Sequence, residues 1–177
     1  MACEIMSKGG LVSDEIVNEI VAKRIAKADC AGGFLLDGYP RTVAQAQCFD
    51  ALLRERSLPA PVVVHLDVRD DALVKRLTAR RQCSKCHKIY NILSQPPVVE
   101  GICDDDGTAL LTRDDDREDV IRERLRAYQN VTGPILAWYG VTRVHTVDGC
   151  GAPERIAAAI ETVVRGALDG SKVVTVA

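Results

Sequence analysis

The strongest constraint on the fold is an apolar run that is followed at once by charge and backbone restriction. Residues 32–42 read GGFLLDGYPRT. The run Phe34-Leu35-Leu36 is typical of a buried strand, and an aspartate, a glycine, an X-Pro bond and an arginine follow it within five residues. Packing alone does not require that crowding. The end of this strand is therefore the first candidate for a functional site.

Strands and helices alternate along the rest of the chain. Two more buried strands are expected at VVVHLDV (62–68) and RVHTVDG (143–149). Such alternation indicates βαβ units, an α/β class and a parallel sheet. We expect the tail GSKVVTVA (170–177) to be frayed or to lie along the surface. Apolar periodicity predicts helices at residues 13–29, 42–57, 70–81, 116–131 and 153–168, with Gly133-Pro134 as an interruption before the third strand.

Size and charge exclude several classes of function. A chain of 177 residues suits one domain with a small insertion. A net charge of −2 and an aromatic content of 4% predict no general attraction to nucleic acid. No apolar run approaches the length that crosses a bilayer. We expect a soluble, cytoplasmic monomer with no nucleic-acid or membrane partner.

A cysteine cluster falls where the periodicity disappears, between residues 82 and 112. CSKC (83–86) and Cys103-x2-Asp106 resemble two zinc knuckles that face each other. Thiolate sulfur and carboxylate oxygen together suit tetrahedral Zn²⁺, so Cys83, Cys86, Cys103 and Asp106 predict a structural zinc site. Three free thiols in a loop are the alternative. The rivals for the fourth ligand are His87, Asp104 and Asp105.

Arginines flank this insertion on both sides. Arg76 and Arg80 are spaced i, i+4, which would place them on one face of the helix 70–81. Arg113 and Arg124 bracket the acidic run 114–116. Guanidinium groups on both sides of a hinged insertion would suit a phosphate-rich ligand under a closing lid. A solvated helix face is the alternative reading, and it is the better one for Arg122 and Arg126.

GFLLDGYPRTVAQAQ resembles the signature of the adenylate kinases and their nucleoside monophosphate kinase relatives. The resemblance extends over essentially the whole chain, and the long insertion looks like the lid of the zinc-bearing bacterial type. It implies a P-loop nucleoside-monophosphate-kinase-like parallel sheet flanked by helices, with an inserted zinc-ribbon-like lid. The other matching stretches are GGLVSDE, RR-x-C-x2-C, PPVVEGICDDDG, LLTRDDD with REDVIRERL, and VDG.

The resemblance also implies a division into parts. Residues 1–12 would be a remnant of the AMP-binding segment, residues 13–80 and 114–177 the core, and residues 81–113 the lid. The reaction would be ATP + AMP = 2 ADP by in-line phosphoryl transfer, with Mg²⁺ as cofactor and AMP, ATP and ADP as ligands.

The resemblance assigns roles to individual residues. Asp37 would hold Mg²⁺ through water, Gln45 would read the adenine edge, and the Tyr39-Pro40 bond would be cis. Asp115 and Asp116 would pair with lid arginines. Arg80, Arg113, Arg124 and Asp37 would be catalytic. AMP would be bound by Gly10, Leu11, Val12, Gly38, Tyr39, Pro40, Arg41, Gln45, Arg113 and Arg124, and ATP by Arg76, Arg80, Ile89, Tyr90 and Gly151.

The family's phosphate-binding loop, G-x-x-x-x-G-K-[ST], does not occur in these 177 residues. We therefore expect an N-terminally truncated copy that lacks the first, central strand of the sheet, leaving its neighbours unpaired. Two alternatives stay open at this point. One is a non-catalytic, zinc-ribbon-bearing nucleotide-binding remnant, and the other is a GTP:AMP phosphotransferase.

Overall fold

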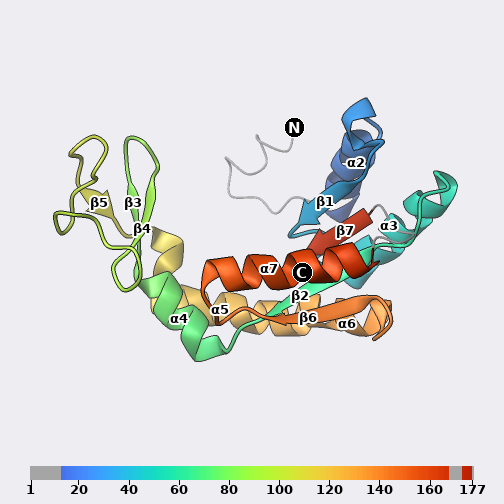
Figure 1. The fold of residues 1–177 in the computed structure, drawn as a ribbon. Helices are drawn as coiled ribbons and strands as arrows, with labels where there is room; N and C mark the ends of the chain where they lie inside the picture. Colours follow the sequence, from blue (N-terminus) through green and yellow to red (C-terminus); the bar gives the residue numbers. More distant parts are fainter. Residues whose placement is uncertain (1–12, 168–172, 177) are drawn as a thin grey trace. The chain divides into compact units, whose positions relative to one another are not determined.

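The structure, a computed structural model, describes residues 13–167 and 173–176 (Figure 1). The chain divides into two compact units. Unit 1 takes in the described residues up to Asp67 and from Asn130 onward, and unit 2 is Val68–Gln129. Unit 2 contains the whole expected lid, residues 81–113, together with the elements on either side of it.

Unit 1 is a small parallel sheet with helices. Its described strands run in the order β1-β7-β2-β6, and every neighbouring pair is parallel. The mixed α/β class is therefore confirmed. The strands are β1 (Phe34–Asp37), β2 (Val62–Asp67), β6 (Val144–Asp148) and β7 (Val173–Val176). The helices are α2 (Asp14–Ile25), the 3-10 turn η1 (Ala28–Cys30), α3 (Val43–Glu55), α6 (Gly133–Tyr139) and α7 (Pro153–Ala167).

Helices cover the sheet according to the alternation of its side chains. Val62 and Val64 of β2 are buried against α7, which runs along β2 and β6 in Figure 1. Val63, between them, packs on the opposite side with Ala46 of α3 and Ile135 of α6. Successive strand residues point to opposite faces, so one strand of consecutive valines fills two cores.

A third cluster fixes β1 and the helices beside it. Phe49 and Leu53 of α3 are buried with Val21 and Ile25 of α2, and Phe34 and Leu36 of β1 pack against them. Thr42 caps α3, since its hydroxyl accepts a hydrogen bond from the backbone N–H of Gln45. The residues just after β1 are therefore held against α2 and α3.

The tail is the first departure from expectation. Val173–Val176 forms β7, which pairs with β1 on one side and with β2 on the other. The expectation of a frayed or surface-lying tail is wrong, and so is the expectation of unpaired neighbours in the centre of the sheet. The physical reason is that the backbone N–H and C=O groups of β1 and β2 need partners, and β7 supplies them.

Unit 2 combines two helices with a small antiparallel sheet. The described strands run in the order β4-β3-β5 and lie in the insertion. Helix α4 lies against α5, and Val74 and Ile121 are buried there. The elements are α4 (Asp70–Thr78), β3 (Arg80–Cys83), β4 (Ile89–Asn91), β5 (Leu110–Leu111), the 3-10 turn η2 (Asp114–Asp116) and α5 (Glu118–Ala127).

The end of α4 is the second departure. The helix ends at Thr78, so Arg80 begins β3 and does not share a helix face with Arg76. Strand β4 causes the change, because the side chain of Asn91 donates to the carbonyl of Arg76 and the N–H of Ile92 donates to that of Ala79. The backbone therefore changes from helix to strand after Thr78, whereas apolar periodicity alone predicts that the helix continues to residue 81.

The interruption expected at Gly133-Pro134 is a change of helix type just before these residues, which are themselves helical. Helix α5 ends at Ala127, a π-helical turn, Tyr128–Thr132, follows, and α6 begins at Gly133 with Pro134 in its first turn.

Among the described residues, no helix is both long enough and apolar enough to cross a membrane.

Proline at position 175 tests the central place of β7. Thr175 is aligned with Leu36 of β1 and with Val63 of β2. Thr175→Pro removes a backbone donor from a strand that is paired on both sides, so we expect a loss of about 3 kcal/mol or more in the free energy of unfolding. Urea unfolding followed by circular dichroism measures it. Thr175→Ala keeps the N–H and is the matched control, and equal midpoints for both variants would contradict the placement of β7.

Candidate nucleotide and metal sites

The residues after β1 form a tight corner in unit 1. Asp37 ends the strand with an exposed carboxylate, and Gly38 has a φ of +68°. A Cβ at Gly38 would lie 3.0 Å from the movable end of the Arg41 side chain, so it is the positive φ that favours glycine here. The Nε of Arg41 donates to the Gly38 carbonyl at 2.8 Å. The Tyr39-Pro40 bond is cis, as expected.

Tyr39 anchors this corner in the core. Its ring meets Phe49 edge to face at 5.6 Å, and its hydroxyl donates to the Asn18 side chain of α2 at 2.7 Å. Burial raises the pKa of Tyr39, so the hydroxyl stays protonated. Tyr39 as a whole is only 7% exposed, so its side chain supports the corner from within.

Gln45 is buried and held at both ends of its carboxamide. Its Oε1 accepts the backbone N–H of Arg41 at 2.7 Å, and its Nε2 donates to Oδ1 of Asp14 at 2.7 Å. The other oxygen of Asp14 accepts the Thr42 hydroxyl at 2.8 Å. Sequence reasoning missed Asp14 and Thr42 at this site. They are hard to single out from the sequence, because aspartate and threonine are common at helix starts and α2 and α3 begin here.

Two further strands end in aspartate at the same edge of the sheet. Asp67 of β2 lies in register with Asp148 of β6, and both are exposed. The Asp67 carbonyl accepts the N–H of Gly149, and the Asp148 side chain accepts the N–H of Cys150. These two bonds shape the loop that leads to Gly151. The sequences VVVHLD and VHTVD show that each strand ends in aspartate, and this shared feature could have predicted the two carboxylates at one edge of the sheet.

Unit 2 gathers three arginines around two adjacent aspartates. Arg80 forms a two-point ion pair with Asp116, whose side chain is fully buried, and this pair raises the pKa of Arg80. Asp115 lies 3.0 Å from Arg113 and 3.6 Å from Arg124. The expected pairing with lid arginines holds for Asp115 and Arg113, whereas Arg80, the partner of Asp116, lies outside the expected lid, residues 81–113. The two pairs of Asp115 place Arg113 and Arg124, which are eleven positions apart, at one carboxylate.

The remaining expected residues are dispersed. Arg76 is exposed on α4, and Ile89 is exposed on β4. Tyr90 is 5% exposed and faces inward, where its hydroxyl lies 3.4 Å from the Cys103 sulfur and accepts the N–H of Asp104. Gly10, Leu11 and Val12 lie outside the described residues.

The cysteine segment folds into two matching turns. In the first, the N–H of Cys83 donates to the Lys88 carbonyl and the carbonyl of Cys83 accepts the N–H of His87. In the second, Cys103 makes the same two bonds with Thr108 and Gly107. His87 and Gly107 have φ values of 61° and 70°, so the chain reverses in the same way in both. Asp106 therefore occupies the position in its turn that Cys86 occupies in the first.

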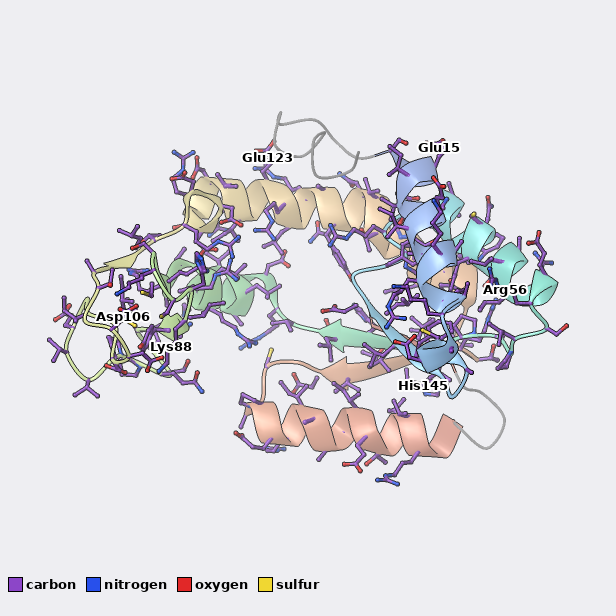
Figure 2. All side chains as sticks on the ribbon, turned by 90° about the horizontal axis from the view of Figure 1, so that it is seen from above. Glu15, Arg56, Lys88, Asp106, Glu123 and His145 are labelled. Carbon is purple, nitrogen blue, oxygen red and sulfur yellow. The ribbon has the colours of Figure 1, made fainter. Side chains whose placement is uncertain are left out.

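The four donor groups converge between these turns. The sulfurs of Cys83, Cys86 and Cys103 and a carboxylate oxygen of Asp106 all lie within 4.8 Å of one another. The backbone N–H of Thr108 holds the pKa of Asp106 below its usual range, and the Tyr90 hydroxyl lowers the pKa of Cys103. Figure 2 shows Asp106 and Lys88 in this segment. The rival ligands Asp104 and Asp105 bind the Val98 N–H and Lys88, respectively.

Three arginines held by two aspartates, and an insertion with four clustered donor groups, are the described features that bear on the class of protein. The comparison with protein families identifies that class, since the adenylate kinase family matches residues 1–144. The chain belongs to the adenylate kinase family, whose members are phosphotransferases, and the resemblance drawn from the sequence is confirmed.

Individual relatives give the extent of the match. An adenylate kinase of Pseudothermotoga lettingae is 49% identical over 135 residues, which are 76% of this chain and 62% of that protein. The adenylate kinase of Thermotoga neapolitana is 43% identical over 162 residues, or 91% of this chain and 74% of that protein. That of Fervidobacterium nodosum is 41% identical over 154 residues, or 86% and 71%. The chain thus spans less than two thirds of the first relative and about three quarters of the second.

Removal of Asp116 tests how firmly Arg80 is held. Asp116→Ala leaves a half-buried guanidinium without its partner, so we expect a loss of about 2 kcal/mol in the free energy of unfolding, measured by urea titration. Asp119→Ala is the control, because the ion pair of Asp119 with Arg117 is largely exposed and should contribute less than about 0.5 kcal/mol. Equal losses in the two variants would show that Asp116 is not what holds Arg80.

Proposed function

We propose that this chain carries the residues of an enzyme that transfers the terminal phosphoryl group of ATP to AMP and so forms two ADP. The observation that carries the proposal is the arginine set of unit 2. Three guanidinium groups are gathered on Asp115 and Asp116 by ion pairs, in a chain that belongs to the adenylate kinase family. Each guanidinium has five N–H donors, so donors remain for phosphate oxygens after the carboxylates are satisfied.

The two units take different parts in this proposal. Unit 1 binds AMP through Gly38, Tyr39, Pro40, Arg41 and Gln45. In unit 2, Arg80, Arg113 and Arg124 bind the phosphates that are joined. Arg76 and Ile89 contact ATP, and so does the backbone of Tyr90, whose side chain faces inward. Gly10, Leu11 and Val12 belong to the AMP side, and Gly151 to the ATP side. Residues 81–113 act as the lid, within a fold of the P-loop nucleoside monophosphate kinase type.

Phosphoryl transfer between two nucleotides needs no covalent enzyme intermediate. The γ-phosphoryl group passes in line from one phosphate oxygen to another, so the protein has to position the reactants and neutralise spread negative charge. Arginines held by buried or shared carboxylates supply that charge without reorganising. Asp37 is the residue that would hold Mg²⁺ through water, and the ion would help to neutralise the negative charge of the phosphates. A closed lid excludes water, the competing acceptor.

The cysteine cluster fits Zn²⁺ in its spacing as well as in its chemistry. Tetrahedral zinc with Zn–S near 2.3 Å and Zn–O near 2.0 Å implies S···S distances of about 3.8 Å and S···O distances of about 3.5 Å. The Cys86 and Cys103 sulfurs are 3.5 Å apart, and the Cys83 sulfur lies 3.4 and 3.5 Å from the oxygens of Asp106. We propose a structural zinc that links the two turns of the insertion.

Two other functions differ from this one in testable ways. A GTP:AMP phosphotransferase would share the acceptor corner and the arginines and would differ in the donor base. A nucleotide-binding remnant would bind AMP without turnover.

Alanine at Arg124 tests the phosphoryl-transfer proposal. In a coupled assay of ADP formation from ATP and AMP, Arg124→Ala should lower kcat by about 100-fold, because it removes charge from the transferring group. Arg126→Ala is the control. Arg126 lies two residues further along α5, is exposed, and its side chain donates a hydrogen bond to the backbone carbonyl of Arg122. Its kcat should stay within about twofold of the parent chain.

The assay is run on the 177-residue chain and on the same chain extended at its N-terminus by the family's strand and phosphate-binding loop, with ATP or GTP as donor. Turnover that falls in Arg124→Ala but not in Arg126→Ala supports the proposal. AMP binding with no turnover in either form would leave the nucleotide-binding remnant. Faster turnover with GTP than with ATP would favour the GTP-dependent alternative.

Substitutions at the fourth donor test the zinc site. Asp106→Ala should lower the affinity for Zn²⁺ by at least about 100-fold and should lower the melting temperature of the zinc-loaded protein. Asp106→Cys should retain zinc, because Asp106 and Cys86 occupy equivalent positions in their turns. Asp105→Ala is the control, and it should retain zinc because Asp105 pairs with Lys88 instead. Zinc content after dialysis would refute the site if Asp105→Ala lost the metal and Asp106→Ala kept it.

A further inference from the structure

We propose that Asp14 is a positioning residue that locks the carboxamide of Gln45 in one orientation and thereby makes the acceptor site selective for adenine over 6-oxopurines. This inference rests on the proposed AMP site, and it concerns a residue to which that proposal gives no role. Its basis is the hydrogen-bonded tie among Asp14, Gln45 and the backbone of Arg41 in unit 1.

The two hydrogen bonds of the Gln45 carboxamide are compatible with only one orientation of the amide. Gln45 Oε1 receives the Arg41 N–H, which can only donate, and Nε2 donates to the Asp14 carboxylate, which can only accept. Rotating the amide by 180° would set a donor against a donor and oxygen against a carboxylate oxygen. Both bonds are 2.7 Å long, and the bond to the carboxylate is charge-assisted. With Gln45 only 5% exposed, water cannot easily replace either partner.

Asp14 is itself held in place. Its second oxygen accepts the hydroxyl of Thr42, and that same hydroxyl caps α3 by accepting the N–H of Gln45. Asp14 also stands in the first turn of α2, where a negative charge is favourable. The carboxylate therefore joins α2 to α3, and its orientation does not depend on a ligand.

A fixed amide distinguishes purines by the order of donor and acceptor. After the two ties, Gln45 keeps one N–H and one oxygen lone pair. Adenine offers an amino donor at position 6 and an acceptor at N1, whereas hypoxanthine and guanine offer an acceptor at position 6 and a donor at N1. An amide that can rotate pairs with either order. An amide that Asp14 and Arg41 hold in place pairs with one of them, and the other leaves its buried groups unpaired.

The test compares AMP with inosine monophosphate (IMP) by isothermal titration calorimetry on the full chain. The parent chain should bind AMP at least about tenfold more tightly than IMP. In Asp14→Asn, one neutral side chain can both donate and accept, so the AMP/IMP ratio should fall at least about fivefold while AMP affinity changes less than about threefold. Glu15→Gln is the matched control, because it removes a charge from the same helix turn at an exposed position, labelled in Figure 2. Its ratio should be unchanged.

Asp14→Glu keeps the carboxylate and should restore most of the ratio, which also keeps the proposal testable if Asp14→Asn folds poorly. Equal weakening of AMP and IMP in Asp14→Asn, with the parent ratio retained, would mean that Asp14 only supports the fold and would overturn this inference alone. A parent chain that binds neither nucleotide would overturn the acceptor site itself and this inference with it.

Discussion

The pairing of β7 with both β1 and β2 is the interaction on which the corner after β1, residues 37–41, depends. Among the described strands, β1 has one hydrogen-bonded neighbour, and that neighbour is β7. Asp37 and the loop to Arg41 begin where β1 ends, so their place at the edge of the sheet follows from this ladder. Helices α2 and α3 then hold the loop from the other side through Tyr39 and Gln45. Backbone pairing sets the position of the corner, and side-chain hydrogen bonds set its shape.

Unit 2 is organised by charge and by backbone turns more than by an apolar core. Its described apolar cluster under the insertion is small and consists of Cys83, Tyr90, Cys103 and Leu110. With so little to bury, this unit relies on ion pairs such as that of Arg80 with Asp116, and the proposed zinc would add a link between the turns of the insertion. The same ion pairs collect the arginines. The carboxylates that stabilise this unit are therefore the ones that hold the three arginines together.

Much of the organisation was predictable from the sequence. The strands around residues 34, 62 and 144 and the helices between them follow from local apolar patterns, and their bounds differ from expectation by a few residues. The spacing of Cys83, Cys86, Cys103 and Asp106 predicted the donor cluster, because each pair lies within one short turn. Arg80 was misplaced on a helix because periodicity cannot register the strand β4, which ends α4 by binding its last carbonyls.

The amino-acid sequence was enough to identify the family, the α/β class, the cysteine and aspartate donors and the residue types at the end of β1, since all of these depend on neighbours close in the chain. Only the folded structure showed that Val173–Val176 enters the sheet between β1 and β2, and that Asp14 holds Gln45 across 31 positions. Each is a pairing of groups that are distant in sequence. Each satisfies a backbone or charged group that would otherwise lack a partner, and no local pattern specifies which partner it finds.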